Sequence, residues 1–321
     1  MSKNRHTIVA ALLALLILAT AGPVAAQQLV AAIVTGDLPR YRQAHTTLET
    51  IVRNAGFDET KLKIFAQTPN SDTMSLTNAI RRSVAAGADL VITYGAAATL
   101  VAAQEVSDVP VLFADVYDPV GLKVVQNLSA PGVNRSGASC TLDQKGLLGN
   151  LLKIDPKVKT IGAMYCSGEE GSRRQLEDLT AAAKELGLYV VSEDAKNAGK
   201  VDSALQALSE KADALFLTES VVITQKGEEI IKLARGKSLP VFSQTPGLVN
   251  QGALLGMFAD PDEQGKLVAV HALQVLAGQK AFILPVRETK KPVLTVNQKT
   301  ASSLGLTIPK PLLDAAASVI R

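Results

Sequence analysis

The chain of 321 residues is poor in aromatic residues and in cysteine. It has no Trp, 7 Phe, 5 Tyr and 2 Cys, so aliphatic residues must fill its core and a disulfide scaffold is excluded. Basic residues number 33 against 30 acidic ones, and no basic block is dense enough to neutralise a run of phosphates. We therefore expect no nucleic-acid partner.

Motifs for catalysis and for metal binding are also missing. G-x-S-x-G, H-E-x-x-H, C-x-x-C and G-x-G-x-x-G do not occur. The two cysteines, Cys140 and Cys166, are compatible with two free buried thiols or with one disulfide. His271 lies on an apolar helix face and is expected in the core, whereas His45 is expected to be exposed. We expect no catalytic residue, no cofactor and no metal.

The first 26 residues have the layout of a secretory signal peptide. Lys3 and Arg5 precede an apolar run from Ile8 to Ala21, and small residues stand before Gln27 as at a cleavage site. The run of 14 residues is shorter than the ~20 that a membrane-spanning helix needs. The sequence therefore predicts cleavage after residue 26 and an exported, periplasmic protein without a membrane anchor.

After Gln27, short apolar runs alternate with longer amphipathic ones. Buried strands that alternate with helices are typical of parallel sheets covered on both faces. Strands are expected at 29–35, 61–66, 90–94, 110–114, 160–165, 189–193, 214–217, 240–243, 254–258 and 292–297, and helices at 40–55, 71–86, from 96, and at 142–152, 172–186, 201–210, 223–236, 261–277 and 298–304.

The same strand–helix rhythm occurs twice, separated by a loop of turn-forming residues at 131–137. This pattern predicts two α/β lobes joined by several crossings, with further crossings near Gly256 and Pro285. Lobes with several connections form a hinge, and hinged lobes commonly close on a ligand.

Candidate site residues follow the strands, because open parallel sheets bind ligands beyond the carboxyl ends of their strands. Aromatic faces and carboxylates gather in these loops, at Tyr41, Tyr94, Tyr117, Tyr165, Asp37, Asp115, Asp118, Glu169 and Glu219. Gly95-Ala96-Ala97 and Gly171-Ser172 each lead into a helix, whose free N–H groups can bind an anion. This set fits a zwitterionic amino acid.

We expect three tyrosines, Tyr94, Tyr117 and Tyr165, to cover such a ligand. The amides of Gly95–Ala97 and Gly171–Ser172 would bind its carboxylate, and Asp118 or Glu219 its ammonium. Plainer explanations exist for single residues. A tyrosine at a strand end is often merely half-buried, and Asp118 and Ser172 are ordinary helix-capping residue types.

Six ordered segments resemble the substrate-binding proteins of ABC transporters, in the group that includes tryptophan- and tyrosine-binding members. They are VITYGAAAT (91–99), PVLFADVYDPVG (110–121), PGVNRSGAS (131–139), KTIGAMYCSGEEGS (159–172), PVFSQTPGLVNQGALLGMFAD (240–260) and LTVNQKTASSLGLTIPKPLL (294–313). The resemblance covers essentially the whole chain after residue 26. The chain departs from many relatives after two strands, where it has Ser243-Gln244-Thr245-Pro246 in place of an Asp and Cys166-Ser167 in place of Asn-Pro.

The resemblance implies a type I periplasmic-binding-protein fold with three crossings between its lobes. We expect lobe 1 at 27–138 plus 257–286 and lobe 2 at 139–256 plus 287–321. It also implies that the strand-end positions face the cleft, namely Tyr94 to Ala97, Asp118, Ser172, Glu219 and Gln244, the last beside Thr245 in the same loop.

The implied function is capture of a small molecule, an amino acid with aromatic ones among the candidates, and its delivery to a membrane permease without chemistry. We expect a monomer. Two alternatives remain open at this point: a sensory module that signals to a membrane kinase or chemoreceptor, and an exported α/β enzyme.

Overall fold

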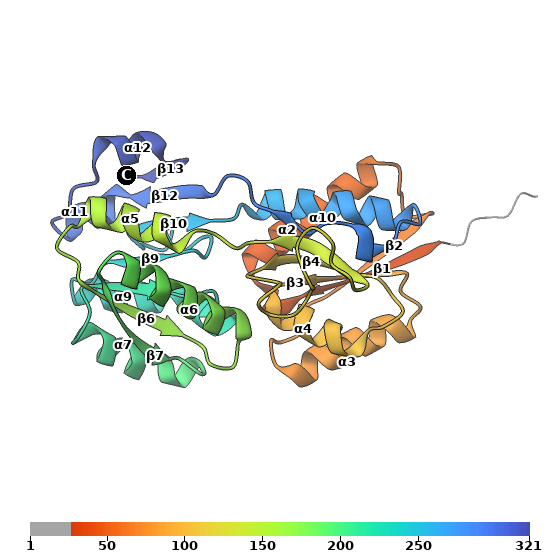
Figure 1. Ribbon diagram of the computed structural model, residues 1–321, viewed down its shortest axis with the longest axis horizontal. Helices are drawn as coiled ribbons and strands as arrows, with labels where there is room; N and C mark the ends of the chain where they lie inside the picture. The colour runs from red at the N-terminus through yellow and green to blue at the C-terminus, as the bar shows by residue number, and fades with distance from the viewer. Residues whose placement is uncertain (1–26) are drawn as a thin grey trace, which may run out of the picture.

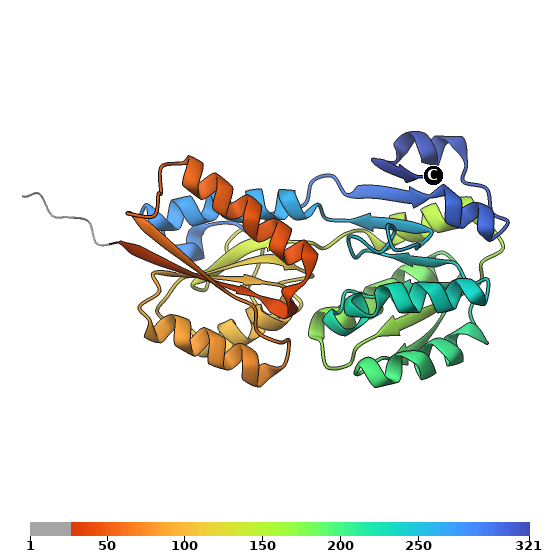
Figure 2. The same cartoon turned by 180° about the vertical axis from the view of Figure 1, so that it is seen from behind.

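Two α/β lobes lie side by side in the computed structural model, which describes residues 27–321 (Figures 1 and 2). The predicted signal peptide, 1–26, lies outside these described residues. Within 27–321, no helix combines the length and the apolar character needed to cross a membrane. The fold class is the predicted one, with two lobes built on mostly parallel sheets.

Lobe 1 is built on a six-stranded sheet in the order β11-β5-β4-β3-β1-β2, and every strand pair is parallel. Its strands are β1 (Gln28–Val34), β2 (Leu62–Gln67), β3 (Leu90–Tyr94), β4 (Val111–Val116), β5 (Arg135–Ser139) and β11 (Arg287–Glu288). Its helices are α2 (Pro39–Asn54), α3 (Thr73–Ala85), α4 (Ala96–Glu105) and α10 (Pro261–Leu276), with 3-10 turns η1 (Thr35–Asp37) and η3 (Ala281–Ile283).

Alternation along β1 explains how helices cover both faces of this sheet. Val30, Ala32 and Val34 belong to a core with α2 and α10. Ala31 and Ile33 belong to a core on the other face with α3 and α4. Because successive side chains of a strand point to opposite faces, an unbroken apolar strand can fill two cores at once.

Lobe 2 has a seven-stranded sheet in the order β13-β12-β10-β9-β8-β6-β7, in which only β10 and β12 pair antiparallel. Its strands are β6 (Thr160–Tyr165), β7 (Tyr189–Asp194), β8 (Ala214–Leu217), β9 (Val241–Ser243), β10 (Leu255–Phe258), β12 (Val293–Asn297) and β13 (Ser318–Ile320). Its helices are α5 (Gln144–Ile154), α6 (Glu170–Glu185), α7 (Val201–Ser209), α8 (Val221–Gln225), α9 (Gly227–Gly236), α11 (Gln298–Ser303) and α12 (Lys310–Ala315), with η2 (Ala198–Lys200). One core lies under α5 and α6, and another under α7 and α9.

The described chain passes between the two sheets three times. The passages follow β5, β10 and β11 (Figure 1). Two of them lie slightly beyond the predicted lobe boundaries, because Met257 and Phe258 pair within lobe 2 and Arg287-Glu288 pairs with β5 in lobe 1.

Several elements differ from the sequence-based expectation. The turn-rich segment at 131–137 runs into β5, in which an arginine is followed by four small residues (RSGAS), and only its pairing with β4 identifies it as a strand. A Cβ at Gly137 would overlap the backbone of Phe113, so close packing requires the small residue there. The helix expected at 223–236 is two helices, α8 and α9, which meet at Lys226.

Both cysteines are free and buried, which settles the alternative left open above in favour of thiols. His271 is a core residue as expected, and its Nε2 lies 2.8 Å from the carbonyl oxygen of Pro285. His45 is half-buried rather than exposed, because its ring packs edge-on against Tyr94.

Candidate ligand-binding site between the lobes

The strand order places a crevice at the carboxyl edge of each sheet. In lobe 1 the chain order reverses between β1 and β3, and in lobe 2 between β6 and β8. Loops leave in opposite directions at such switch points, which makes them the usual ligand sites of open α/β sheets. The loops after β1 and β3 meet the loops after β6 and β8 in a shared cavity.

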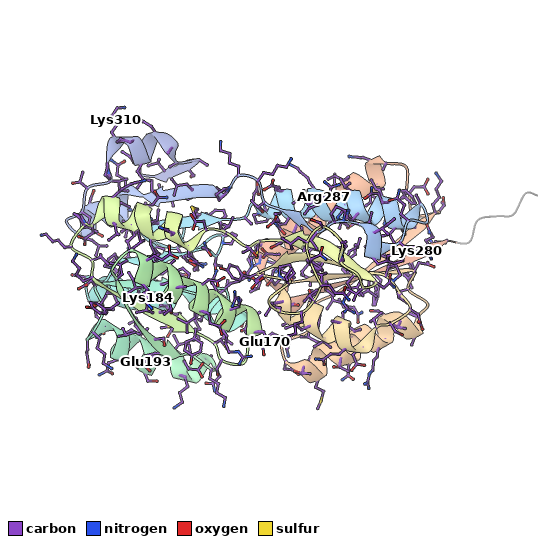
Figure 3. The ribbon with its side chains drawn as sticks, in the orientation of Figure 1. Glu170, Lys184, Glu193, Lys280, Arg287 and Lys310 are labelled. Carbon is purple, nitrogen blue, oxygen red and sulfur yellow. The ribbon has the colours of Figure 1, made fainter. Side chains whose placement is uncertain are left out.

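This inner cavity is lined from both lobes, by Thr35, Arg40, Tyr41, Gly95, Ala96, Ala97, Glu169, Glu170, Gly171, Ser172, Glu219 and Val221. Its volume of about 20 Å³ holds one or two water molecules. Figure 3 shows Glu170 at the boundary between the lobes. A larger groove of about 340 Å³ also borders Arg40, between the start of α2 and lobe 2, where helix α8 contributes Thr224 and the loop after β9 contributes Pro246.

Two helix N-termini face each other across the inner cavity. Helices α4 and α6 both begin without a side-chain cap, so their first N–H groups have no partner within the helix. The helices approach closely, because a Cβ at Gly171 would lie 3.3 Å from the Cβ of Ala96. Two such termini concentrate positive potential and free donors, which suits a carboxylate.

The neighbouring helix α8 shows a different arrangement. The carboxylate of Glu169 accepts hydrogen bonds from the N–H of Val221 at 3.0 Å and from the hydroxyl of Ser220 at 2.8 Å. Ser220 in turn caps Ile223. The α8 terminus is therefore already satisfied by protein groups, and Glu169 is occupied there.

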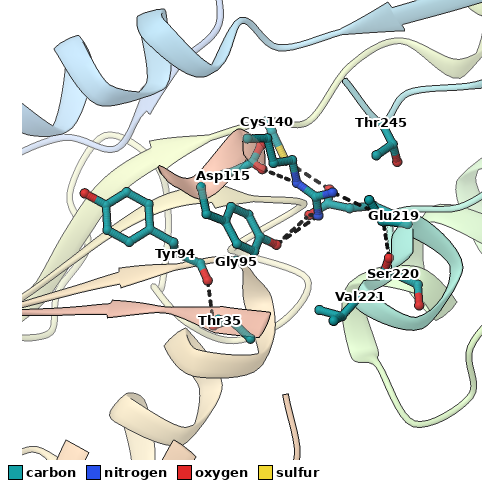
Figure 4. A network of polar contacts seen from close by, with 12 residues as sticks. Thr35, Tyr94, Gly95, Asp115, Cys140, Glu219, Ser220, Val221 and Thr245 are labelled. Carbon is teal, nitrogen blue, oxygen red and sulfur yellow. Dashed lines mark hydrogen bonds and ion pairs between the residues drawn. The ribbon is translucent and has the colours of Figure 1, made fainter. Parts of the chain in front are cut away.

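A buried ion-pair cluster of Arg40, Asp115 and Glu219 borders the inner cavity (Figure 4). Arg40 lies near the start of α2 and donates to Asp115 Oδ2 at 2.9 Å within lobe 1 and to Glu219 Oε1 at 3.1 Å in lobe 2. It also donates to the hydroxyl of Tyr41 at 2.9 Å. One guanidinium thus joins the two lobes across the site.

The cluster holds two carboxyl groups and one cation. Burial, followed by the nearby charge of Asp115, raises the pKa of Glu219 to about 7, although Arg40 acts in the opposite direction. Burial lowers the pKa of Arg40, but the groups of Tyr41, Glu219 and Asp115 outweigh it and keep the guanidinium charged. An additional cation near Glu219 would complete the charge balance.

Asp115, Cys140 and Glu219 also bring their ligand atoms within 4.8 Å of one another, as a metal site would require. Arg40 already places its cationic group against both carboxylates. Burial raises the pKa of the Cys140 thiol, which keeps it in the protonated form that binds metals poorly. The donor set therefore fits a guanidinium better than a metal ion.

Eight of the residues predicted from the sequence line the inner cavity: Tyr41, Gly95, Ala96, Ala97, Glu169, Gly171, Ser172 and Glu219. Gly95 has a φ of 84°, and a Cβ there would overlap the hydroxyl of Tyr41. Ser172 is not a cap of its own helix. Its hydroxyl accepts from the N–H of Cys166 at 2.9 Å and contacts that of Thr218 at 2.7 Å, which holds the ends of β6 and β8 together.

Four predicted residues lie beside this cavity, where the two lobes meet. The hydroxyl of Tyr117 donates to Asp178 of α6 at 2.9 Å, and Asp118 pairs with Arg174 of the same helix at 2.6 Å. Gln244 and Thr245 are buried in lobe 2 beyond Glu219. Figure 4 shows Thr245 near Glu219 without a hydrogen bond to any residue drawn.

Asp115, also predicted, belongs to the buried cluster with Arg40. Three other predicted residues lie elsewhere. The ring of Tyr94 packs in the lobe 1 core and its hydroxyl lies 3.0 Å from His45 Nδ1, pointing away from the cluster (Figure 4). Tyr165 ends β6, half-buried, and does not line the inner cavity. Asp37 is exposed at the mouth of the larger groove and pairs with Arg42 at 2.6 Å.

Sequence reasoning missed the residues that contribute most polar contacts, Arg40, Gln144 and Gln175. An isolated arginine is usually solvated, and the two glutamines lie in helices, away from the strand-end loops. A signal for the glutamines was present, because Gln144 shares a helix face with Leu147, Leu148 and Leu151, and Gln175 one with Leu179. A polar residue on an apolar helix face indicates a buried polar role.

Two α/β lobes joined by three crossings, with a polar cavity between opposed switch points, define the type I periplasmic-binding-protein fold. Residues 29–320 match the family described as ABC transporter substrate binding protein, and the chain belongs to that family. A tyrosine-binding protein from Clostridioides difficile is 26% identical over 249 residues, which is 78% of this chain and 72% of the relative.

Solved structures agree with this assignment. An ABC domain from Streptococcus pneumoniae in complex with L-Trp is 25% identical, with a TM-score of 0.88 over 92% of this chain and all of that one. The ligand-free, open structure of a substrate-binding protein with adhesive properties from Clostridium difficile is 24% identical, with a TM-score of 0.70 over 92% of this chain and 99% of that one. At nearly equal identity, the lobe arrangement here is more similar to the L-Trp complex.

Proposed function

We propose that the chain is the exported solute-binding component of an ABC importer, that it closes on an amino acid and that it releases this amino acid unchanged to a permease. The observation that carries the proposal is the pairing of opposite charges at the inner cavity. Uncapped α4 and α6 termini offer donors for a carboxylate, while Glu219 lacks a full counter-charge and can accept an ammonium. The α-carboxylate and α-ammonium of an amino acid match these two features.

Binding requires the lobes to open. A cavity of about 20 Å³ is far smaller than an amino acid, and Arg40 bridges the two lobes beside it. In the open form, Arg40 keeps Asp115 as its partner within lobe 1, which leaves Glu219 of lobe 2 to the ligand. The binding of aromatic amino acids by the two relatives supports the ligand class.

Calorimetric titration with a panel of amino acids tests the proposal. For the tightest ligand, the amide that lacks the carboxylate charge and the des-amino acid that lacks the ammonium should each bind at least about 10-fold more weakly, a difference of about 1.4 kcal/mol. Analogues that bind as well as the parent amino acid, or binding of another solute class alone, would refute it.

Export and delivery need their own measurements. Sequencing the mature protein from the periplasmic fraction should give a first residue of Gln27. Uptake of the labelled ligand by cells should fall when the chain is deleted and return with the parent protein but not with Glu219→Gln. Unchanged uptake after deletion would contradict the transport function.

A further inference from the structure

Three buried glutamines of lobe 2 form a connected amide chain that the charge-pairing site does not use. They are Gln144 at the start of α5, Gln175 in α6 and Gln244 after β9, and each is at least nine-tenths buried. Gln175 Nε2 donates to Gln244 Oε1 at 2.9 Å, and Gln144 Nε2 donates to the same oxygen at 2.8 Å.

A backbone group determines which way each amide points. The N–H of Glu219 donates to Gln175 Oε1 at 2.6 Å, and an N–H can only donate. The NH₂ group of Gln175 must therefore donate to Gln244, and Gln244 must accept through its carbonyl oxygen. Gln144 must then present its own NH₂. The oxygen and nitrogen of a glutamine amide can often be exchanged without changing the fit. Here the N–H of Glu219 fixes the orientation of all three amides.

This orientation leaves a donor and an acceptor unused. Gln244 Nε2 and Gln144 Oε1 are buried without a hydrogen-bond partner, and so is Thr245 Oγ1. Thr245 is fully buried, and Gln144 and Gln244 are 4% and 8% exposed. Buried polar atoms are normally paired, and each unpaired one costs about 1–3 kcal/mol.

The unused atoms lie next to the proposed site. Gln175 links Glu219 directly to Gln244, so the amide chain begins at the residue proposed to bind the ligand ammonium. On its other side, Gln144 Nε2 lies 3.4 Å from the hydroxyl of Tyr117, which comes from lobe 1. The amide chain therefore extends along the boundary at which the lobes close.

We infer that Gln144, Gln244 and Thr245 form a subsite for the end of the ligand side chain, and that this end must both donate and accept a hydrogen bond. A hydroxyl or a carboxamide satisfies both glutamine atoms. An indole N–H only donates and satisfies Gln144 alone, and a hydrocarbon satisfies neither. This inference rests on the proposed function, because the amide chain starts at Gln175, which is bonded to the N–H of Glu219, the residue proposed to bind the ligand ammonium.

Matched ligand pairs test the inference on the mature chain. The pairs are L-Tyr with L-Phe and L-Gln with L-Met, whose members differ mainly at the side-chain end. Of the two pairs, we consider the one that the protein binds more tightly. In this pair, the member whose side chain ends in a donor and an acceptor should bind about 100-fold more tightly than the other member. The reason is that a site built for such a group rejects an analogue that leaves its polar atoms unpaired. L-Trp should bind more weakly than L-Tyr, and its fluorescence reports binding directly because the protein has no Trp.

The variants Gln144→Met and Gln244→Met should each reduce this preference to less than about 10-fold while binding of the hydrocarbon member is kept, which shows that the variant is folded. Gln206→Met on the exposed side of α7 is the matched control and should keep the full preference. Equal binding of both members of each pair by the parent protein would overturn the inference and leave the proposed function standing. Failure to bind any amino acid would instead refute the proposed function, and the subsite with it.

Discussion

Two sets of ion pairs join the lobes, one in the interior and one at the rim. In the interior, Arg40 bridges Asp115 and Glu219, and the three side chains are 4%, 10% and 14% exposed. At the rim, Arg174 pairs with Asp118, with side chains 38% and 21% exposed. The rim pair is the shorter, at 2.6 Å against 2.9 and 3.1 Å.

Burial, and not distance, decides what these contacts do. Water and salt screen an exposed pair, whose net value is about 0–1 kcal/mol. Charges in the interior have lost their hydration and depend on each other, so removal of one partner is costly. The interior set therefore determines whether the closed form is stable, while the rim pair adjusts how the lobes meet.

The largest effect is expected from removing the single cation of the interior cluster. In Arg40→Met, the carboxylates of Asp115 and Glu219 lose their shared partner and face each other in a buried setting. We expect the free energy of unfolding to fall by about 4 kcal/mol. Urea unfolding at about pH 8, above the pKa of about 7 of Glu219, measures the change.

Adding Glu219→Gln to this variant removes one of the two carboxylate charges and should restore part of the lost stability. Arg42→Met is the matched control, because Arg42 is an exposed arginine of the same helix that pairs with Asp37. It should change the unfolding free energy by no more than about 0.5 kcal/mol. An Arg40→Met protein as stable as the parent would show that the cluster does not stabilise the closed form.

The next effect concerns pH. The folded pKa of Glu219, about 7, lies above its ordinary value of 4.5 because the side chain is buried and close to Asp115. The folded state thus binds the proton more tightly than the unfolded state. The contribution of Glu219 is fully favourable below pH 4.5 and is lost as pH rises through about 7, a total of about 3 kcal/mol.

Other carboxyl groups titrate in the same range, so the comparison must be made against Glu219→Gln. Between about pH 4.5 and 7, the unfolding free energy of the parent should fall relative to that of the variant. Ligand affinity should move the opposite way in the parent and rise with pH, because an ammonium needs the ionised carboxylate. If the difference in unfolding free energy between the parent and Glu219→Gln does not change across this pH range, Glu219 is not the group that titrates there.

A smaller effect is expected where the two uncapped helices meet. A side chain at Gly171 would press on Ala96 of the other lobe, since even a Cβ would approach to 3.3 Å. In Gly171→Val we expect ligand affinity to fall about 10-fold, or 1.4 kcal/mol, with the unfolding free energy nearly unchanged. Calorimetry measures the affinity, and small-angle X-ray scattering should show a larger radius of gyration.

Gly168→Val is the control for this change. Gly168 lies three residues earlier, in the loop that precedes α6, and a Cβ there would meet no atom within 4 Å. It should leave both affinity and radius unchanged. If both variants weaken binding equally, the cause lies in the loop backbone and not in the contact between the lobes.

The sequence was sufficient for much of the fold because the central strands are uninterrupted apolar runs. The strands at Leu90–Tyr94, Thr160–Tyr165 and Ala214–Leu217 have the predicted bounds. Strand β5 was not predicted because each of its residues (RSGAS) is either small or polar, and only its pairing with β4 defines it. Pairing partners that are distant in sequence cannot be seen in local periodicity.

The sequence predicted the part of the candidate site that lies where the parallel strands end. Strand ends gave Gly95, Ser172 and Glu219, which line the inner cavity. Arg40 was missed because its partners Asp115 and Glu219 are 75 and 179 residues away, and its burial exists only once both lobes are folded and closed. Tyr94 was expected over the ligand, but strand alternation turns its ring into the lobe 1 core.

The smallest effect should come from the rim. Arg174→Gln removes the pair with Asp118 while Tyr117 keeps its hydrogen bond to Asp178. We expect ligand affinity to change by less than about threefold at an ionic strength of about 0.15 M and not at all at about 1 M, where the Debye length is only about 3 Å. Calorimetric titration at both salt concentrations measures this dependence.

The same salt series on Arg40→Met provides the contrast between the two regions. We expect Arg40→Met also to bind the ligand more weakly, because the closed form loses its buried bridge between the lobes. This loss of affinity should persist at about 1 M salt, because buried charges are screened much less than exposed ones. A rim variant that weakens binding as much as the interior one, and equally at both salt concentrations, would mean that exposure does not separate the two sets of ion pairs. Closure would then depend on the total number of contacts between the lobes and not on the buried cluster.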